Sequence, residues 1–440
     1  MIQLALLLFG AGFLRRNAYL LALIGLLWAA LGLVILIDGL DGVRYFPLTL
    51  FGAVLLAESI VTLLVASNSD GAQRTVLAFK GGAFLLLAVL VLFGGTVSNF
   101  LLALVFGLTY FALGIFQIAS AWVVRYDGWR KSLLIGAAQV AFGILMFQPY
   151  PTNYVGTASA FIGVTMLAAG INTLRVAVWA RRLRHDCAMF NLTAPAELRL
   201  PSSASGQADN GPAAAPGHAD ALTIHVWTPE GSAKNTTVPR PVFNRYIAAV
   251  DVNGVISTGH AALEMVPNIY ISLYPAVDID RSPSEFFNLL KAGKENDVPG
   301  TYQPDYATES KAWCPSTRQV TFTSYNRDGL LAFWRKYRAE PVYNLTRRNC
   351  SSSVSYALES ALDGVLARHS RNWLHVLRTL LMPELWIAAQ VRRRAQIMAW
   401  TPGLTLDYCR ALRAVVHPVD RPWFKRLVRA LQRNAISSRT

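Results

Sequence analysis

Cys350 and His260 are the residues of this chain whose types and surroundings best fit nucleophilic chemistry. Cys350 stands in the stretch NCSSSV (349–354), at the predicted start of an amphipathic helix, and His260 follows a glycine on a predicted strand. A thiol attacks a carbonyl carbon readily when its pKa is lowered, and both the positive end of a helix and a nearby imidazole lower it. The serines after Cys350 cap the helix and leave backbone N–H groups for a developing oxyanion. The pair therefore predicts a thiol hydrolase or acyltransferase acting on an amide, ester or thioester.

The other cysteines indicate no second centre of this kind. The chain has four cysteines, at positions 187, 314, 350 and 409, which are too few and too scattered for a disulfide framework or a zinc site. Neither a metal-ligand spacing nor a glycine-rich nucleotide motif is present, so we expect no metal and no cofactor. The alternative for the pair itself is that Cys350 is a small buried residue and His260 a structural one.

The stretch NCSSSV resembles the nucleophile motif of the NlpC-type papain-fold superfamily, in which a polar residue, cysteine, serine, a small residue and an aliphatic residue follow one another. A histidine that precedes the cysteine resembles the circularly permuted branch, which includes relatives of lecithin:retinol acyltransferase. The resemblance covers about residues 222–365. It implies a papain-like α+β fold with Cys350 as the nucleophile and His260 as the base.

The resemblance also implies a polar residue on the next strand that orients the imidazole. The residue twelve positions after His260 is Ser272, which we predict as the third catalytic residue. Tyr270 shares a strand face with Ser272 and would replace it if the turn had another register. Glu264 lies on the face of His260 but about 13 Å further along the strand, too far to orient the ring. We expect Tyr270 and Glu264 to contact substrate.

The elements that position these residues form an α+β domain. Segments 221–229, 245–266, 270–275 and 318–325 are rich in β-branched and aromatic residues and predict strands, with Asn253-Gly254 as a hairpin turn. Segments 327–340 and 351–362 predict helices. Between the strands lies a polar insertion, residues 276–315, which could cover the site as a lid.

The first half of the chain predicts a membrane domain. Hydrophobic residues make up 53% of the chain and charged residues 15%. Six long apolar stretches predict spanning helices at 18–37, 45–66, 76–95, 99–124, 132–148 and 154–179. Residues 1–16 are too short to span and predict an interfacial segment. Basic residues gather in the loops on one side of these spans, which places both ends of the domain in the cytoplasm.

Glycines seven residues apart recur in the apolar stretches, at 25/32, 107/114, 136/143 and 163/170. Each pair lies on one helix face and lets another helix approach closely, either in this chain or in a homo-oligomer. The repeat over residues 18–180 resembles the HdeD-like six-helix acid-resistance membrane proteins. Glu58, an acid near the middle of the second stretch, predicts a buried partner such as Gln117 or Asn172.

Two segments flank the α+β domain. Residues 186–221 are rich in Ala, Pro, Gly and Ser and predict a flexible linker. Residues 366–440 interleave tryptophans with basic residues, and the stretch PELWIAAQVRRRAQIMAW (383–400) predicts an interfacial helix on anionic lipids rather than a nucleic-acid contact. The alternative is a helical cap packed on the α+β domain.

The sequence thus predicts a multidomain protein of the bacterial inner membrane. A six-helix transmembrane domain (1–185) would be followed by the linker, a cytoplasmic permuted papain-like domain (222–365) and a basic helical tail. Its substrate would be an acyl lipid or a membrane protein, held near the site by the anchor. The alternative is a non-enzymatic HdeD-like stress protein whose soluble domain binds lipid or a partner.

Overall fold

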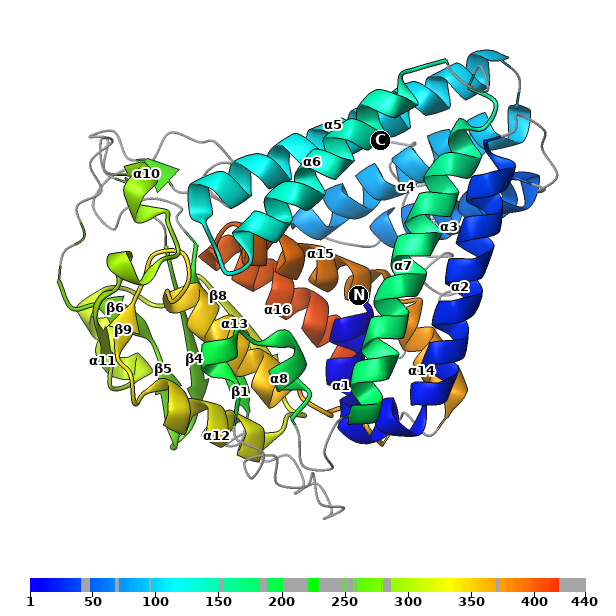
Figure 1. The fold of residues 1–440 in the computed structure, drawn as a ribbon. Coiled ribbons are helices and arrows are strands. Elements are labelled where there is room, and N and C mark those ends of the chain that lie inside the picture. Colours follow the sequence, from blue (N-terminus) through cyan, green and yellow to red (C-terminus); the bar gives the residue numbers. More distant parts are fainter. Residues whose placement is uncertain are drawn as a thin grey trace, which may run out of the picture. The chain divides into compact units, whose positions relative to one another are not determined.

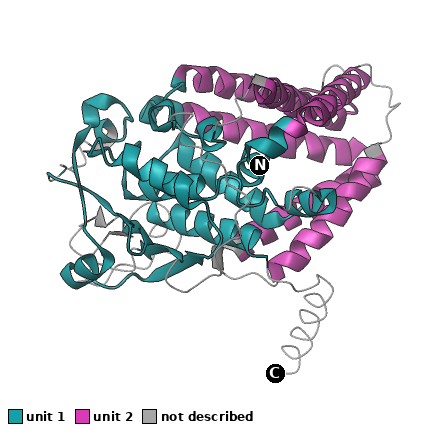
Figure 2. Cartoon of the chain, turned by 90° about the horizontal axis from the view of Figure 1, so that it is seen from below, with its two compact units in different colours: residues 1–15, 120–129, 183–418 teal, residues 16–119, 130–182, 419–440 magenta. Residues whose placement is uncertain are grey.

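The computed structural model describes residues 1–40, 48–67, 71–94, 96–149, 154–182, 188–200, 221–228, 249–250, 256–257, 259–277, 279, 286–368 and 372–418. These residues form two units, which Figure 2 shows in different colours. Unit 1 contains residues 1–15, 120–129 and the described part of 183–418. Unit 2 contains the described parts of 16–119 and 130–182.

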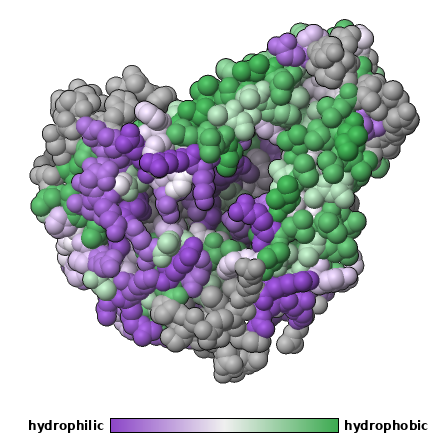
Figure 3. Space-filling view, viewed as in Figure 1, coloured by the Kyte–Doolittle hydropathy of each residue, from purple (hydrophilic) through white to green (hydrophobic). Residues whose placement is uncertain are grey.

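Unit 2 is built from the apolar helices. In the described part of the chain, five helices are long and apolar enough to cross a membrane. These are α2 (Ala18–Asp38), α3 (Leu48–Ser67), α4 (Gly71–Phe93), α5 (Thr96–Val124) and α7 (Thr157–Arg182) (Figure 1). A helix also forms at the remaining predicted span, but α6 (Trp129–Met146) opens with Arg130 and Lys131 and does not reach the same apolarity. The outer surface of α2, α5, α6 and α7 is largely hydrophobic in Figure 3, as lipid-facing helices require.

The spaced glycines pack helices of this chain against one another. A Cβ added at Gly163 of α7 would lie 2.8 Å from the carbonyl oxygen of Gly32 in α2. One added at Gly143 of α6 would lie 2.9 Å from the carbonyl oxygen of Gly107 in α5. The glycine faces of α2 and α7, and of α5 and α6, are therefore occupied within the chain. Homo-oligomerisation through these faces stays a prediction.

Glu58 has a partner that differs from the two predicted for it. Its Oε1 lies 2.6 Å from Nζ of Lys80, so an ion pair joins α3 to α4. Lys80 is also 5.1 Å from the centre of the Phe84 ring. Because two opposite charges share this position, neither has to be buried in an apolar helix bundle without a counter-charge.

Unit 1 contains small antiparallel sheets. The largest has the strand order β5-β4-β1-β8. Its strands are β1 (Leu222–Trp227), β4 (His260–Met265), β5 (Ile269–Ile271) and β8 (Arg318–Phe322). A second sheet has β6 (Leu273–Pro275), β7 (Val298–Tyr302) and β9 (Val342–Tyr343), and β2 (Ala249–Val250) pairs with β3 (Ile256–Ser257). The predicted Asn253-Gly254 turn lies outside the described residues.

The alternation of side chains along the largest sheet separates its core from its polar face. Leu222, Ile224 and Val226 of β1 are fully buried on one face, beside Ala261 and Leu263 of β4. The residues between them point to the opposite face, because successive side chains of a strand alternate. That opposite face carries His225 and Trp227 of β1 and His260 and Glu264 of β4, with Trp227 opposite His260.

Helices surround the sheets of unit 1. The longer ones are α1 (Ile2–Arg16), α12 (Arg327–Tyr337), α13 (Cys350–Ala361), α14 (Trp373–Leu380), α15 (Pro383–Ile397) and α16 (Pro402–Val416). Shorter helical segments are α8 (Phe190–Thr193), η1 (Ala196–Leu198), α10 (Phe286–Leu289), η4 (Lys294–Asn296) and α11 (Tyr306–Ala312). Every residue of α13 is buried, which makes it the central helix of the unit.

A buried ion pair joins α13 to the C-terminal helices. Arg392 of α15 donates from Nε to Oε1 of Glu359 at 2.6 Å and from Nη2 to Oε2 at 3.0 Å. Tyr408 of α16 donates to the same carboxylate at 2.9 Å. Arg392 belongs to the stretch predicted to lie on lipid, so α15 instead packs into unit 1 as a helical cap. The physical reason is that Glu359, fully buried in α13, needs a counter-charge.

Parts of the predicted interfacial segment (1–16) and of the predicted linker (186–221) also belong to the core of unit 1. Leu7 and Leu8 of α1 are fully buried, and their carbonyl oxygens accept hydrogen bonds from the N–H groups of Gly364 and Leu366. Residues 1–15 therefore group with unit 1 rather than with the membrane helices. Phe190, in the predicted linker, is also fully buried, and its N–H donates to Asp363 at 3.0 Å.

Removing one partner of the Glu359–Arg392 pair should strongly destabilise unit 1. Arg392→Ala leaves the Glu359 carboxylate buried without its counter-charge, and we expect a loss of about 3–5 kcal/mol in the free energy of unfolding. Denaturant titration of the protein in detergent, followed by tryptophan fluorescence, measures it. The matched control is Arg393→Ala, because Arg393 is exposed. Equal, small effects of the two substitutions would contradict a structural role of the pair.

Candidate active site

Cys350 occupies the first position of the buried helix α13. Asn349 caps this helix: its Oδ1 accepts the N–H of Ser352 at 2.8 Å, and its own N–H donates to Oγ of Ser352 at 2.9 Å. The Asn349 side-chain amide also donates to the carbonyl oxygen of Trp400 at 2.9 Å. The predicted helix start is confirmed, and the cap holds the thiol at the positive end of the helix.

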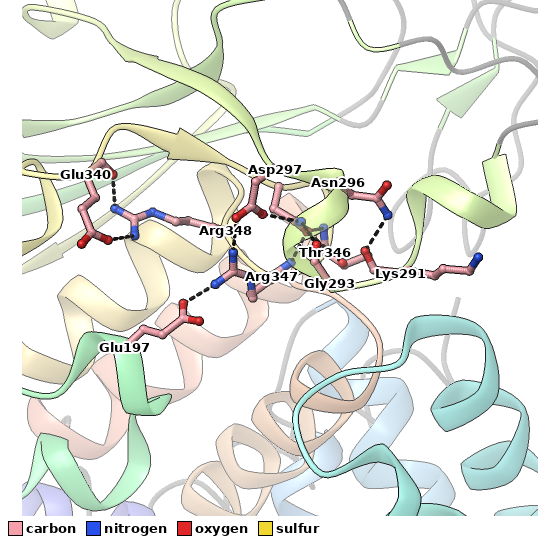
Figure 4. A network of polar contacts seen from close by, with 10 residues as sticks. Glu197, Lys291, Gly293, Asn296, Asp297, Glu340, Thr346, Arg347 and Arg348 are labelled. Atoms are coloured by element: carbon pink, nitrogen blue, oxygen red, sulfur yellow. Dashed lines mark hydrogen bonds and ion pairs between the residues drawn. The ribbon is translucent and has the colours of Figure 1, made fainter.

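The turn before Cys350 is held by a network of polar contacts, which Figure 4 shows from close by. Asn344 is fully buried, and its side-chain amide donates to Asp297 at 2.9 Å while its Oδ1 accepts the N–H groups of Thr346 and Arg347. Arg347 in turn pairs with Asp297 at 2.5 Å and with Glu197. These contacts fix the path of the chain into α13.

Arg348 contributes to the same turn from the other side. Its guanidinium donates to the carbonyl oxygen of Tyr337 at 2.7 Å and lies 4.1 Å from the centre of the Tyr337 ring. It also donates to the carbonyl oxygen of Glu340. The two arginines before the nucleophile therefore serve the architecture of the turn rather than an open basic surface.

His260 begins β4 beside the sulfur of Cys350. The backbone N–H of Ala261, the next residue, is near enough to the Cys350 thiol to help lower its pKa. Gly259 takes φ +70°, a left-handed conformation that favours glycine and turns the chain directly before His260. The imidazole stacks on the Tyr274 ring with centroids 4.2 Å apart and is 3% exposed. The fold therefore brings the two predicted reactive residues to neighbouring backbone positions.

The Nε2 atom of His260 faces two oxygen atoms. Oγ of Ser272 lies 2.8 Å away, where the resemblance implied the third residue. Oε1 of Glu309 lies 3.3 Å away. The tautomer with its proton on Nε2 donates toward these oxygens and leaves Nδ1 as the proton acceptor. In the described part of the chain no hydrogen bond joins the Cys350 thiol directly to the imidazole, so the proton transfer requires a closer approach than the one in this structure.

Glu309 is a candidate site residue that the sequence did not indicate. It lies on α11, inside the predicted lid, and is 3% exposed. Both Tyr270 and Tyr274 donate their hydroxyl hydrogens to its carboxylate, Tyr274 at 2.6 Å. The available signal was the spacing of Tyr306, Glu309 and Trp313, which predicts one face of a helix turned towards the core.

Tyr270 and Glu264, predicted to contact substrate, have protein partners. Tyr270 binds Glu309, as described above. Oε2 of Glu264 lies 3.1 Å from Nε2 of His225, whose Nδ1 lies 3.1 Å from Oγ of Ser316 and whose ring stacks on Tyr306. Because Tyr306 begins α11, this second histidine–acid pair anchors the helix that carries Glu309. Contact of Tyr270 or Glu264 with substrate stays a prediction.

Burial sets the resting protonation states of the pair. It lowers the pKa of His260 to about 4, with the Glu309 charge opposing the effect. It raises the pKa of the Cys350 thiol, although hydrogen bonds from Ser351 and Ala261 lower it in part. The structure thus differs from the lowered thiol pKa that the sequence predicted, because desolvation of α13 outweighs the stabilising N–H groups. At neutral pH the pair rests as a thiol and a neutral imidazole.

Comparison with known proteins leaves the family open: no protein-family model, curated protein or solved structure matches this chain. Both resemblances noted in the sequence therefore stay predictions, and the functional argument rests on the geometry of the site.

The protonation state of His260 can be checked directly. NMR titration of histidine-labelled protein in detergent, assigned with His260→Gln, should show a neutral imidazole from pH 8 to about 5 and protonation near 4. Glu309→Gln should lower the pKa further, because the carboxylate is the charge that opposes the effect of burial. Glu264→Gln is the matched control, since Glu264 binds His225. A His260 pKa of 6.5 that is the same in wild type and in Glu309→Gln would contradict this assignment.

Proposed function

We propose that the chain is a membrane-anchored thiol hydrolase or acyltransferase. The observation that carries the proposal is a capped helix N-terminus that presents Cys350 beside His260, whose Nε2 faces Ser272 and Glu309. Nucleophile, base and orienting groups come from α13, β4, the β5–β6 junction and α11. If Cys350 were only a small buried residue, there would be no reason for a neighbouring histidine to have this set of polar partners.

The reaction begins with a proton transfer coupled to attack. As the Cys350 sulfur bonds to the carbonyl carbon, Nδ1 of His260 takes the thiol proton, and the Glu309 carboxylate stabilises the imidazolium that forms. The negative charge develops on the carbonyl oxygen, and the N–H groups of Ser351 and Ala261, which lie close enough to the sulfur to lower the thiol pKa, are the donors available to it. Tyr270 and Tyr274 keep the carboxylate in place, since burial and Glu309 both raise their pKa values and leave them as neutral donors.

The tetrahedral intermediate then collapses and expels the leaving group, which receives the proton from His260. A thioester between the acyl group and Cys350 remains. Water, or an alcohol or amine acceptor, attacks this thioester while His260 again takes a proton, and the thiol is released with a proton restored. Water gives hydrolysis and another acceptor gives acyl transfer.

The apolar helices indicate the class of substrate. Among the residues that the structure describes, five helices are apolar enough to cross a membrane, and a tethered site meets membrane-bound substrates at high effective concentration. An acyl lipid or a membrane protein therefore suits the site better than a free cytosolic peptide. The basic loops favour the cytoplasmic face of a bacterial inner membrane.

Trapping of the covalent intermediate tests the proposal. Detergent-solubilised protein is incubated with a short-chain thioester, quenched in acid and digested, and the peptide that contains Cys350 is examined by mass spectrometry. We expect an acyl adduct on Cys350, no adduct at that position in Cys350→Ala and at least a hundredfold slower formation in His260→Ala, in line with the typical contribution of about 10²–10⁴ from a general base. Cys314→Ser is the matched control.

Two results would count against the chemistry. An adduct that forms equally fast in wild type and His260→Ala would describe an ordinary accessible thiol. No adduct on Cys350 with any of a series of thioesters and activated esters would favour the non-enzymatic alternative, in which the domain binds a lipid or a partner.

A further inference from the structure

Helix α14 exposes its apolar side chains instead of burying them. Trp373, Leu374 and Leu377 of the helix and Leu381, the residue that directly follows it, are 68%, 57%, 43% and 71% exposed. Their spacing places them on one face, because residues three and four apart are neighbours on a helix. The opposite side carries the polar groups of His375, Arg378 and Thr379, and Val376 and Leu380 are half-buried.

This exposure is a property of α14 and not of the helices next to it along the chain. In α15, Leu385, Ile387 and Ala388 are buried, and α16 buries most of its apolar residues. Asn372 caps α14, since its Oδ1 accepts the N–H of Leu374 at 3.0 Å. A capped helix with a continuous apolar face in solvent is unusual on a soluble surface and marks an interaction site.

The chain passes directly from unit 1 into the apolar helices. Residues 1–15 belong to unit 1, and α2 begins at Ala18, directly after α1. Residues 120–129 also belong to unit 1 and include the end of α5. If α2, α3, α4 and α5 cross a membrane in succession, the start of α2 and the end of α5 lie on the same side, so both of these junctions with unit 1 lie at one membrane surface.

We propose that α14 is an interfacial helix that lies in the headgroup region of this membrane with Trp373, Leu374, Leu377 and Leu381 towards the acyl chains. Tryptophan is favoured at the membrane interface. A strongly amphipathic helix with a basic residue on its polar face, here Arg378, fits a lipid surface better than a protein groove when membrane attachments lie in the same unit. This proposal assigns the lipid contact that the sequence predicted for α15 to α14. It does not depend on the chemistry of Cys350.

Spin-label accessibility in proteoliposomes tests this assignment on the full chain. The parent has its four native cysteines replaced by serine or alanine. Leu374→Cys, Leu377→Cys and Leu381→Cys report on the apolar face, and Arg378→Cys is the matched control on the polar face. Each labelled variant is reconstituted in vesicles of phosphatidylethanolamine and phosphatidylglycerol, and its collision rates with oxygen and with a water-soluble nickel complex are compared.

We expect the apolar-face labels to collide more with oxygen than with nickel, and the Arg378→Cys label to show the reverse. Greater nickel collision at all four positions would place α14 in water and overturn the proposal. Apolar-face labels shielded from both reagents would show that protein covers the face, and spin–spin broadening there would identify a second copy as the cover. Either result would also overturn it.

Discussion

The burial of α13 is the constraint on which the rest of unit 1 depends. A helix with no solvent-exposed residue has to satisfy its terminal backbone groups and its polar side chains within the protein. At its start Asn349 caps the free N–H groups, and towards its end Glu359 needs the charge of Arg392. The C-terminal helices α15 and α16 are therefore part of the domain that carries the site, although a basic sequence rich in tryptophan suggested a separate tail.

The same burial determines the chemistry available to Cys350 and His260. In water-exposed surroundings a helix N-terminus and an imidazole would favour a thiolate–imidazolium pair. Here desolvation disfavours both charges, raising the pKa of the thiol and lowering that of the imidazole. In the proposed reaction charge arises only during attack, and Glu309, 3.3 Å from Nε2 of His260, is the negative group next to the ring that would become positive. A resting neutral pair also avoids two unsolvated ions when no substrate is bound.

Local pattern predicted the parts of the site that depend on short-range sequence. The helix start at Cys350 and the strand at His260 were visible because serines after a polar residue and a glycine before a β-rich segment act within a few positions. Ser272 followed from the position that the family resemblance implies for an orienting residue after the histidine. The sequence could not predict whether these residues react. It also could not predict the direction in which the thiol pKa is shifted, because burial is a property of the whole domain.

Long-range pairings were the parts that the sequence could not predict. Glu309 comes from α11 inside a polar insertion, and no spacing relative to His260 marks it. Arg392 lies in a run of three arginines, and its buried position depends on Glu359, which is on another helix. The N-terminal helix α1 looked like an interfacial segment because apolar residues suit a core as well as a membrane, and its partners near Gly364 are distant in sequence. In unit 2 the glycine spacing predicted close packing, but not that α2 would pair with α7.

The proposed chemistry requires that Cys350 and His260 act together as a neutral thiol–imidazole pair. Its most direct test is the rate of Cys350 alkylation by iodoacetamide, followed by peptide mass spectrometry from pH 5 to 9 in wild type and in His260→Ala. Because the imidazole is deprotonated above about pH 4 and the thiol pKa is raised, general-base attack predicts a rate that stays nearly constant from pH 5 to 8 in wild type. We expect His260→Ala to abolish this plateau. A rate that rises about tenfold per pH unit in both proteins would show an isolated buried thiol and contradict the proposed chemistry.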